Sequence, residues 1–176
     1  MRELADAGRI RQFMRALGRE AIAPGRVFLT GGATAVLIGW RETTVDVDVK
    51  FVPEQDAVLR AVPALKESLR MNVELASPDD FIPVPENWAD RSPFISQAER
   101  LAFHHFDLTA QALAKIERGH AQDRDDVRAM LERGLVTPAG IREAFAHIES
   151  QLYRYPAIDP AAFARAVEAA LAPHVI

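Results

Sequence analysis

The chain has 176 residues, of which 49% are hydrophobic and 26% charged, and its formal net charge is −4. This length and composition allow a buried core and do not favour disorder, while the lack of cysteine excludes disulfides and thiolate metal sites and fits a reducing compartment. The negative charge disfavours a nonspecific coat on nucleic acid, and we expect a cytoplasmic protein with neither signal peptide nor membrane span.

The opening segment predicts an amphipathic helix that Pro24-Gly25 terminates. Its apolar residues recur at helical spacing: Ile10, Phe13, Met14 and Leu17. Its basic cluster consists of arginines: Arg9, Arg11, Arg15 and Arg19. Such a cluster is either a solvated face or a contact for RNA or a nucleotide, and both alternatives stay open.

Residues 26–38 predict a buried strand, a glycine turn and a short helix. The apolar run Val27–Leu29 stops at Thr30-Gly31-Gly32, a composition typical of a strand that ends in a turn needing open backbone geometry. The first N–H groups of a helix over residues 33–38, beside two glycines, would form a concavity suited to phosphate.

The next predicted strand, Val45-Asp46-Val47-Asp48-Val49, alternates between apolar and acidic residues. We therefore expect both aspartates on one face and the three valines on the other. Carboxylates two residues apart on a strand are separated by roughly 6.5–7 Å and can share a divalent cation; magnesium prefers such oxygen ligands. Solvent-facing aspartates without a ligand would have the same spacing.

A helix is predicted over residues 54–69, where Pro63 is expected to bend or divide it. Residues 71–76 alternate again and predict a third strand, on which Glu74 faces away from its aliphatic neighbours. The proline-rich residues 77–96 are predicted to be a long connection that can conceal short strands.

A fourth strand is predicted over residues 99–106. On a strand the adjacent His104 and His105 would point to opposite faces, so we expect structural roles for them rather than a shared metal. Four helices are predicted to follow. The first starts at Asp107 and stops at Gly119, and the second, whose start Asp123 and Asp126 flank, stops at Gly134. The third starts at Thr137-Pro138 and the fourth at Asp159-Pro160.

The predicted fold class is therefore α+β. Residues 1–106 would form a small mixed β-sheet of about four strands with flanking helices, and residues 107–176 a C-terminal helical bundle packed on that core. The glycine turn is neither a P-loop nor a dinucleotide fingerprint, because the residues that each motif requires after it are missing.

Three motifs in this order resemble the nucleotidyltransferase superfamily: Thr30-Gly31-Gly32, Asp46-Val47-Asp48 and Val73-Glu74-Leu75. The stretch GGATAVLIGWRETTVDVDV is similar to small bacterial stand-alone nucleotidyltransferase-like proteins related to the abortive-infection toxins of toxin–antitoxin pairs. Those proteins also carry a helical lysine followed by an Arg/Asp segment, and Lys115-Ile116-Glu117-Arg118 through Asp123 looks similar.

The resemblance implies the nucleotidyltransferase fold and the matching enzyme activity. Such an enzyme transfers a nucleoside monophosphate from a nucleoside triphosphate to an RNA, a protein or a small-molecule acceptor, with Mg²⁺ as cofactor. It implies an antitoxin partner if the protein is a toxin. The implied metal ligands and catalytic residues are Asp46, Asp48 and Glu74. The implied nucleotide contacts are Thr30, Gly31, Gly32, Lys115 and Asp123.

Other interpretations of the same residues stay open. Lys115 can be an ordinary lysine of an amphipathic helix, and Asp123 with Asp126 has the spacing of a helix-capping pair. The protein as a whole can be a nucleotidyltransferase-like module that binds a nucleotide or a partner without turnover, or a structural, antitoxin-like component of a heteromer.

Overall fold

The computed structural model of the protein describes residues 1–174. These residues form two compact units, which are described separately. The first unit comprises residues 1–77 and 92–106, and the second comprises residues 78–91 and 107–174. Residues 78–91, which lie within the predicted first domain, thus belong to the second unit.

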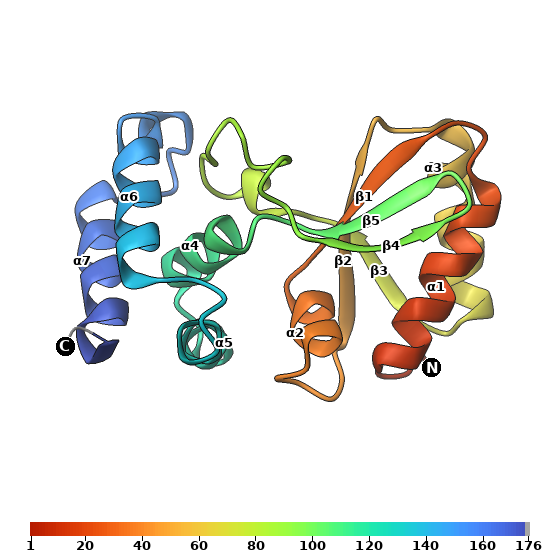
Figure 1. Ribbon diagram of the computed structural model, residues 1–176, viewed down its shortest axis with the longest axis horizontal. Coiled ribbons are helices and arrows are strands. Elements are labelled where there is room, and N and C mark those ends of the chain that lie inside the picture. The colour runs from red at the N-terminus through yellow and green to blue at the C-terminus, as the bar shows by residue number, and fades with distance from the viewer. Residues whose placement is uncertain (175–176) are drawn as a thin grey trace. The chain divides into compact units, whose positions relative to one another are not determined.

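The first unit is built on a five-stranded mixed sheet with the strand order β3-β2-β1-β5-β4, as Figure 1 shows. The central strand β1 pairs antiparallel with β2 and parallel with β5, while β3 is parallel to β2. The α+β class is confirmed, with one strand more than predicted. The strands are β1 Gly25–Thr30, β2 Asp46–Val52, β3 Asn72–Leu75, β4 Phe94–Ala98 and β5 Leu101–His105.

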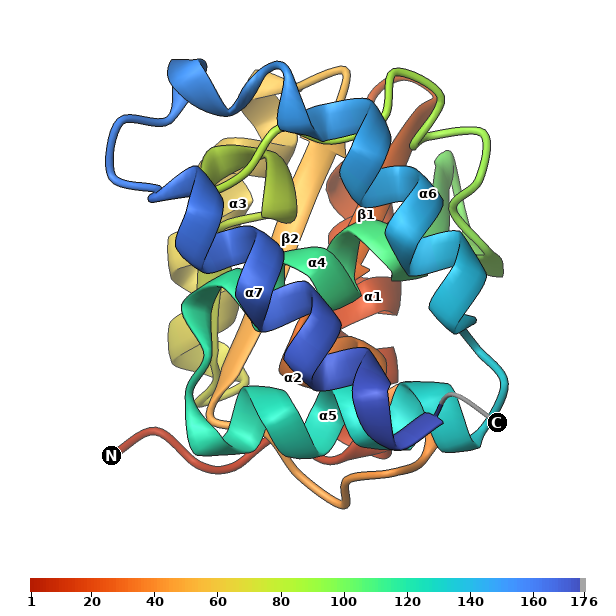
Figure 2. The same cartoon turned by 90° about the vertical axis from the view of Figure 1, so that its left-hand side faces the viewer.

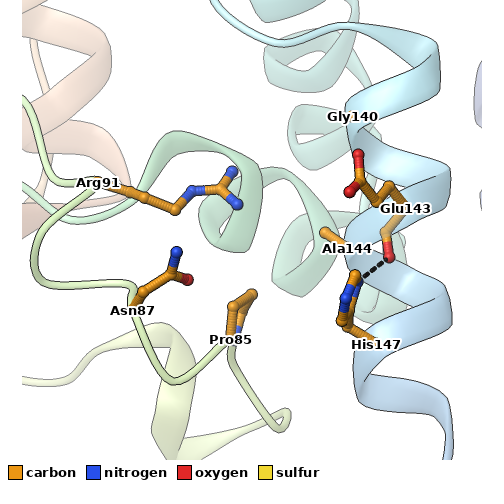
Figure 3. Close-up of a pocket in the computed structure, with 7 residues that line it drawn as sticks. All are labelled: Pro85, Asn87, Arg91, Gly140, Glu143, Ala144 and His147. Carbon is orange, nitrogen blue, oxygen red and sulfur yellow. Dashed lines mark hydrogen bonds between the residues drawn. The ribbon is translucent and has the colours of Figure 1, made fainter.

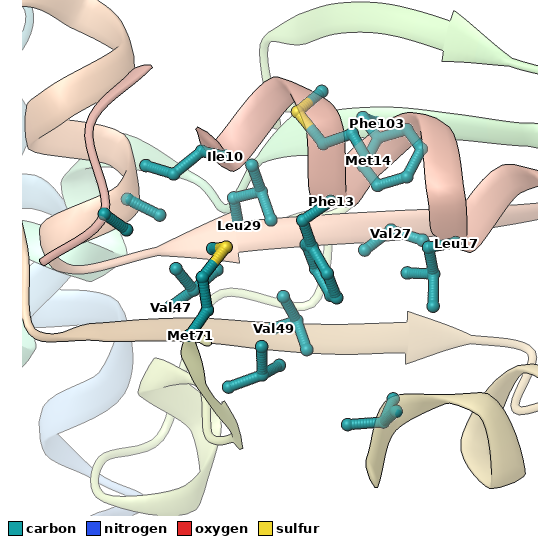
Figure 4. Close-up of a cluster of buried hydrophobic side chains, with 14 of the residues drawn as sticks. Ile10, Phe13, Met14, Leu17, Val27, Leu29, Val47, Val49, Met71 and Phe103 are labelled. Carbon is teal, nitrogen blue, oxygen red and sulfur yellow. The ribbon is translucent and has the colours of Figure 1, made fainter. Parts of the chain in front are cut away.

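The helices of the first unit are α1 Ala7–Glu20, α2 Gly32–Ile38 and α3 Asp56–Ser68. Helices α1 and α3 lie on the same side of the sheet (Figure 1). The predicted apolar stripe of α1 is confirmed, because all four of its residues are buried. Figure 4 shows them packed against sheet residues of the core, including Val27, Leu29, Val47, Val49 and Phe103.

Strand β2 confirms the predicted alternation. Val47 and Val49 are buried in the core, whereas Asp46 and Asp48 lie on the opposite, partly exposed face. The expectation that Val45 joins the buried valines is wrong, since Val45 is 64% exposed. The strand begins only at Asp46, and Thr44 before it is held separately by a bridge to Ala5.

Proline does not divide α3. Pro63 lies inside one continuous helix, although its ring removes a backbone donor and normally weakens a helix interior. Val58 and Val62 bury one side of this helix in the core, and we attribute the helix's continuity to that packing.

The end of the first unit is a hairpin rather than the single strand predicted over residues 99–106. Strand β4 lies partly within the predicted connection, and β5 begins only at Leu101. Glu99, which we expected within the strand, has φ +51° between the two strands. Neither Gly nor Asn marks this turn, so the usual sequence signal of a tight hairpin is missing.

The second unit contains four helices, visible in Figure 2: α4 Leu108–Arg118, α5 Ala121–Glu132, α6 Pro138–Glu149 and α7 Pro160–Leu171. Its short 3₁₀ turns are η1 Pro78–Asp80, η2 Leu152–Arg154 and η3 Ala172–His174. The predicted N-caps Asp107, Thr137 and Asp159 are confirmed, since each side chain accepts a backbone hydrogen bond. No helix within residues 1–174 is long and apolar enough to cross a bilayer.

Candidate active site

Asp46 and Asp48 share one face of β2 because side chains alternate along a strand and their apolar neighbours are fixed in the core. On the adjacent parallel strand β3, Glu74 is the register partner of Asp48. Neighbouring strands are about 4.8 Å apart, so this register places the third predicted carboxylate directly beside the pair. The structure thus brings Asp46, Asp48 and Glu74 together on one face of the sheet.

Asn72 joins this group, although we did not predict it. It is the register partner of Asp46, and its Nδ2 amide donates hydrogen bonds to the Asp46 carboxylate and to Oε1 of Glu74, the latter at 3.1 Å. The side-chain amide of Asn72 therefore links the carboxylate of Asp46 on β2 to that of Glu74 on β3. The available signal was its position two residues before Glu74, which puts both side chains on the same face.

The glycine turn lies against the same carboxylates. Gly31 has φ +61° and ψ −127°, a conformation that only glycine adopts readily, and a Cβ added there would be 3.0 Å from Oδ2 of Asp48. A Cβ on Gly32 would be 2.0 Å from Oγ1 of Thr44. Both glycines are therefore required locally. The buried Thr30 is the antiparallel register partner of Asp48.

The carboxylates fit a magnesium ion in chemistry, although they do not form a ready-made cage. Within residues 1–174, no three His, Asp or Glu side chains are grouped so that they could hold a metal ion. Mg²⁺ is commonly held by one or two carboxylates, with water and substrate phosphates completing its coordination. Asp46 and Asp48 supply the hard oxygen donors that this mode of binding needs.

Behind the glycine turn lies a buried histidine. Nδ1 of His105 is 3.0 Å from Oγ1 of Thr34 on α2. Burial, with smaller contributions from the positive charges of Arg11 and His104, lowers the pKa of His105 to about 4. The ring is therefore neutral at physiological pH. Nδ1 of His104 is instead 3.0 Å from the carbonyl oxygen of Ser92.

In the second unit, the predicted nucleotide contacts Lys115 and Asp123 belong to a buried ionic cluster between α4 and α5. Nζ of Lys115 lies 2.7 Å from Oδ2 of Asp126 and 3.9 Å from Oδ1 of Asp123. Arg118 donates through Nε to Asp123 at 2.8 Å. Burial alone would raise the pKa of Asp123, but the hydrogen bonds and charges of its cationic neighbours outweigh burial and lower it.

Sequence reasoning missed Asp126 as the nearest partner of Lys115. The i, i+3 spacing of the two aspartates places both on one side of α5, and the same spacing also fits a helix-capping pair. Asp123 does accept the backbone N–H of His120 at 3.1 Å, so it also serves the start of α5.

The second unit also has a pocket of about 240 Å³ between residues 85–91 and α6, shown in Figure 3. None of the predicted site residues lines it. Arg91 points into this pocket, and its Nε is 3.5 Å from Oδ2 of the buried Asp107. The pocket is lined by Pro85, Asn87, Arg91, Gly140, Glu143, Ala144 and His147.

Comparison with known proteins places the chain in a family. A family model described as "Nucleotidyltransferase of unknown function (DUF6036)" matches residues 8–137, a range that contains β2 with its aspartates and the ionic cluster of α4 and α5. Neither the curated proteins nor the solved structures compared with the chain gave a match. Because the matched range spans most of the sequence, the protein belongs to this nucleotidyltransferase family.

Proposed function

We propose that the protein catalyses magnesium-dependent transfer of a nucleoside monophosphate from a nucleoside triphosphate to an acceptor. One observation carries the proposal: Asp46 and Asp48 share a sheet face with Glu74 beside them and the Gly31 backbone against Asp48. Together with membership of a nucleotidyltransferase family, this arrangement favours phosphoryl chemistry over a pair of merely solvated aspartates.

In the proposed reaction, Asp46 and Asp48 would hold Mg²⁺, which would neutralise phosphate charge. The backbone of Gly31 and Gly32, with Thr30, contacts the phosphates. An acceptor oxygen forms a bond to the α-phosphorus, the bond from that phosphorus to the bridging oxygen of the β-phosphate breaks, and pyrophosphate leaves. Glu74 accepts the proton of the attacking hydroxyl.

The resemblance adds Lys115 and Asp123 to the proposal as nucleotide contacts. A lysine ammonium is a compact charge that suits a phosphate, and Asp123 would position it. In the structure the Lys115 ammonium is buried and paired with Asp126, so this role requires the ammonium to become accessible to the phosphate.

The acceptor can be an RNA, a protein side chain or a small hydroxylated molecule, since each requires the same catalytic core. The resemblance to abortive-infection toxins adds the proposal that the protein acts as the toxin of a toxin–antitoxin pair. A stable heteromer recovered on co-expression with a chromosomally neighbouring partner would support that role.

The test is label transfer. The protein is incubated with Mg²⁺ and each α-³²P-labelled nucleoside triphosphate, together with total cellular RNA or protein, and the acceptor fraction is examined for label. Asp46→Ala and the double substitution of Asp46 and Asp48 by Asn should abolish transfer without unfolding the protein. Asp56→Asn, which removes an exposed carboxylate on α3, is the matched control. Full transfer by Asp46→Ala would remove the proposal.

A second candidate is a module that binds nucleotide without turnover. It is favoured by the link that Asn72 makes between Asp46 and Glu74, two of the carboxylates that the proposed reaction uses. Calorimetric binding of a magnesium–nucleotide complex without label transfer to any acceptor would select this candidate.

A further inference from the structure

The sheet face that carries the aspartates also carries three aromatic rings. Phe28 on β1 is the register partner of Lys50, which lies two residues beyond Asp48 and therefore on the same face. His104 on β5 is the partner of Phe28, and Phe94 on β4 is the partner of His104. The registers thus place an aromatic row, Phe28–His104–Phe94, on the face of Asp46 and Asp48.

Contacts within the first unit hold the inner part of this row in place. Phe28 is fully buried, and its ring stacks on His104 with 5.4 Å between centroids. The guanidinium of Arg26 lies 5.4 Å from the Phe28 centroid. Nδ1 of His104 lies 3.0 Å from the Ser92 carbonyl oxygen, which restrains the orientation of the imidazole. The row is therefore anchored at its inner end.

The outer end of the row is exposed. Phe94 meets His104 edge to face, with centroids 5.5 Å apart and an interplanar angle of 76°, yet 62% of the residue is accessible to solvent. An edge-to-face contact with one neighbour covers at most one face of the phenyl ring. Phe94 therefore ends the row with a ring accessible to solvent on the sheet face of the carboxylates, where a flat ligand can stack on it.

We propose that Phe94 is a stacking platform for a nucleobase. This inference rests on the proposed function, because it takes the aspartates as the place where phosphates bind. Three strand spacings and two residues along the strand separate Phe94 from Asp48, which corresponds to a Cα–Cα distance of about 16 Å. A ribose and its phosphates can span the gap that remains between a ring on Phe94 and a metal at the aspartates.

Two sources can supply such a base: the nucleoside triphosphate itself, or a nucleotide of an acceptor strand. Both present the same flat π-surface, and stacking of a base on an aromatic side chain tolerates any base. Loss of one such stack is expected to weaken binding between about 5-fold and 100-fold.

The direct test uses Phe94→Trp as a fluorescent reporter, with the wild-type protein measuring the background from Trp40 and Trp88. Each nucleoside triphosphate, a short single-stranded RNA and inorganic tripolyphosphate are titrated in the presence of Mg²⁺. We expect quenching of the new indole by a ligand that carries a base and none by tripolyphosphate. Equal responses to tripolyphosphate and to the base-bearing ligands would overturn the platform.

A second series separates stacking from simple apolar contact. Phe94→Tyr retains the ring and should bind base-bearing ligands like the wild type, whereas Phe94→Leu should lose 5-fold to 100-fold in affinity. Tripolyphosphate affinity should not change in either variant. Phe81→Leu, at another phenylalanine that is 58% exposed, is the matched control.

The two sources and the two proposals give different outcomes. If Phe94→Leu binds nucleoside triphosphates more weakly than Phe94→Tyr does, the stacked base belongs to the donor nucleotide. If the two variants differ only in their affinity for the RNA, the stacked base belongs to the acceptor. Unchanged nucleotide and RNA affinity in Phe94→Leu overturns the platform alone. Absence of binding of all these ligands to the wild-type protein overturns the proposed function and the platform together.

Discussion

The ammonium of Lys115 lies 2.7 Å from the carboxylate of Asp126, and the two side chains are only 7% and 2% exposed. Asp123 is a second carboxylate near the same ammonium, but Arg118 also pairs with it. Of the two carboxylates, that of Asp126 is therefore the nearer to the Lys115 ammonium. Removing either member of the close pair would leave a charge in the interior without its nearest counter-charge.

We expect Lys115→Met to lower the free energy of unfolding by about 3–5 kcal/mol, the usual effect of breaking a buried ion pair. The double variant Lys115→Met with Asp126→Leu should recover most of this loss, because neither charge of the close pair then remains in the interior. Urea denaturation measures both effects. Arg128→Ala removes an exposed cation of α5 and serves as control. A loss below about 1 kcal/mol in Lys115→Met would contradict a buried pair.

The glycine turn gives a prediction with an internal control. Gly31→Ala should destabilise the protein by about 1–3 kcal/mol because of its backbone conformation, and should also weaken binding of magnesium–nucleotide, because the new Cβ approaches Asp48. Gly39→Ala has a similar backbone penalty at φ +112°, but nothing lies within 4 Å of its Cβ. Thermal unfolding and calorimetry on both variants separate strain from ligand effects; equal nucleotide affinities would contradict the expected crowding.

The elements of this fold that local patterns specify were predictable. The alternation of β2 and the capping residues Asp107, Thr137 and Asp159 were correctly read because each is encoded within a few neighbouring residues. Strand β4 was foreseen only as a short strand that the connection can conceal, because it forms through pairing with β5 and contact with α1, where a Cβ on Gly18 would be 2.5 Å from the carbonyl oxygen of Ala98. Such tertiary contacts leave no periodic signal.

Protonation of His105 gives a pH-dependent stability. Its pKa is about 4 in the folded protein and 6.5 in the unfolded chain, so the unfolded state binds the proton first as pH falls. This group's contribution is fully present above pH 6.5 and is lost between pH 6.5 and about 4, by roughly 3 kcal/mol. Chemical denaturation across this range measures the loss.

The matched variants for that experiment are His105→Gln and His147→Gln. The first should reduce the difference between pH 6.5 and 4, because the buried imidazole of His105 is gone, and the second, at an exposed histidine of α6, should leave the profile of the wild type. Parallel profiles for His105→Gln and the wild type would show that His105 does not contribute the expected proton linkage.

Asp107 is expected to act through its capping oxygen rather than through its charge. Burial raises its pKa, an effect that Arg91 and two backbone hydrogen bonds only partly offset, so the stability of the fold decreases as pH rises from the unfolded pKa to the folded pKa. Oδ1 accepts the N–H of Thr109 at 3.2 Å, whereas Oδ2 is buried without a hydrogen-bond partner.

Asp107→Asn keeps the capping acceptor and removes the buried charge, so we expect its unfolding free energy at pH 7 to stay within about 1 kcal/mol of the wild type. Asp107→Ala loses the cap and should be destabilised by about 1–2 kcal/mol. Guanidinium denaturation of the two variants decides the matter. Equal losses in both would mean that the ion pair with Arg91 stabilises the fold more than the cap does.

The carboxylates of the candidate site could be predicted from the sequence, but the residues that contact the predicted site residues could not. Asp46, Asp48 and Glu74 could be named because their strands alternate, and the structure gathers them on one face. Asn72 and Asp126 were missed because their importance comes from which strand or helix lies beside them. Neither residue type is a signal until that neighbour is known.

The strict alternation of β2 also constrains how this chain can vary. A slip of one residue along β2 would turn Val47 and Val49 outward and Asp46 and Asp48 into the core, so the packing of the valines also determines where the carboxylates point. Insertions or deletions should therefore be tolerated in the link over residues 40–43 and rejected within residues 46–52. In a deletion scan, loss of folding and loss of the carboxylate site should coincide throughout that strand.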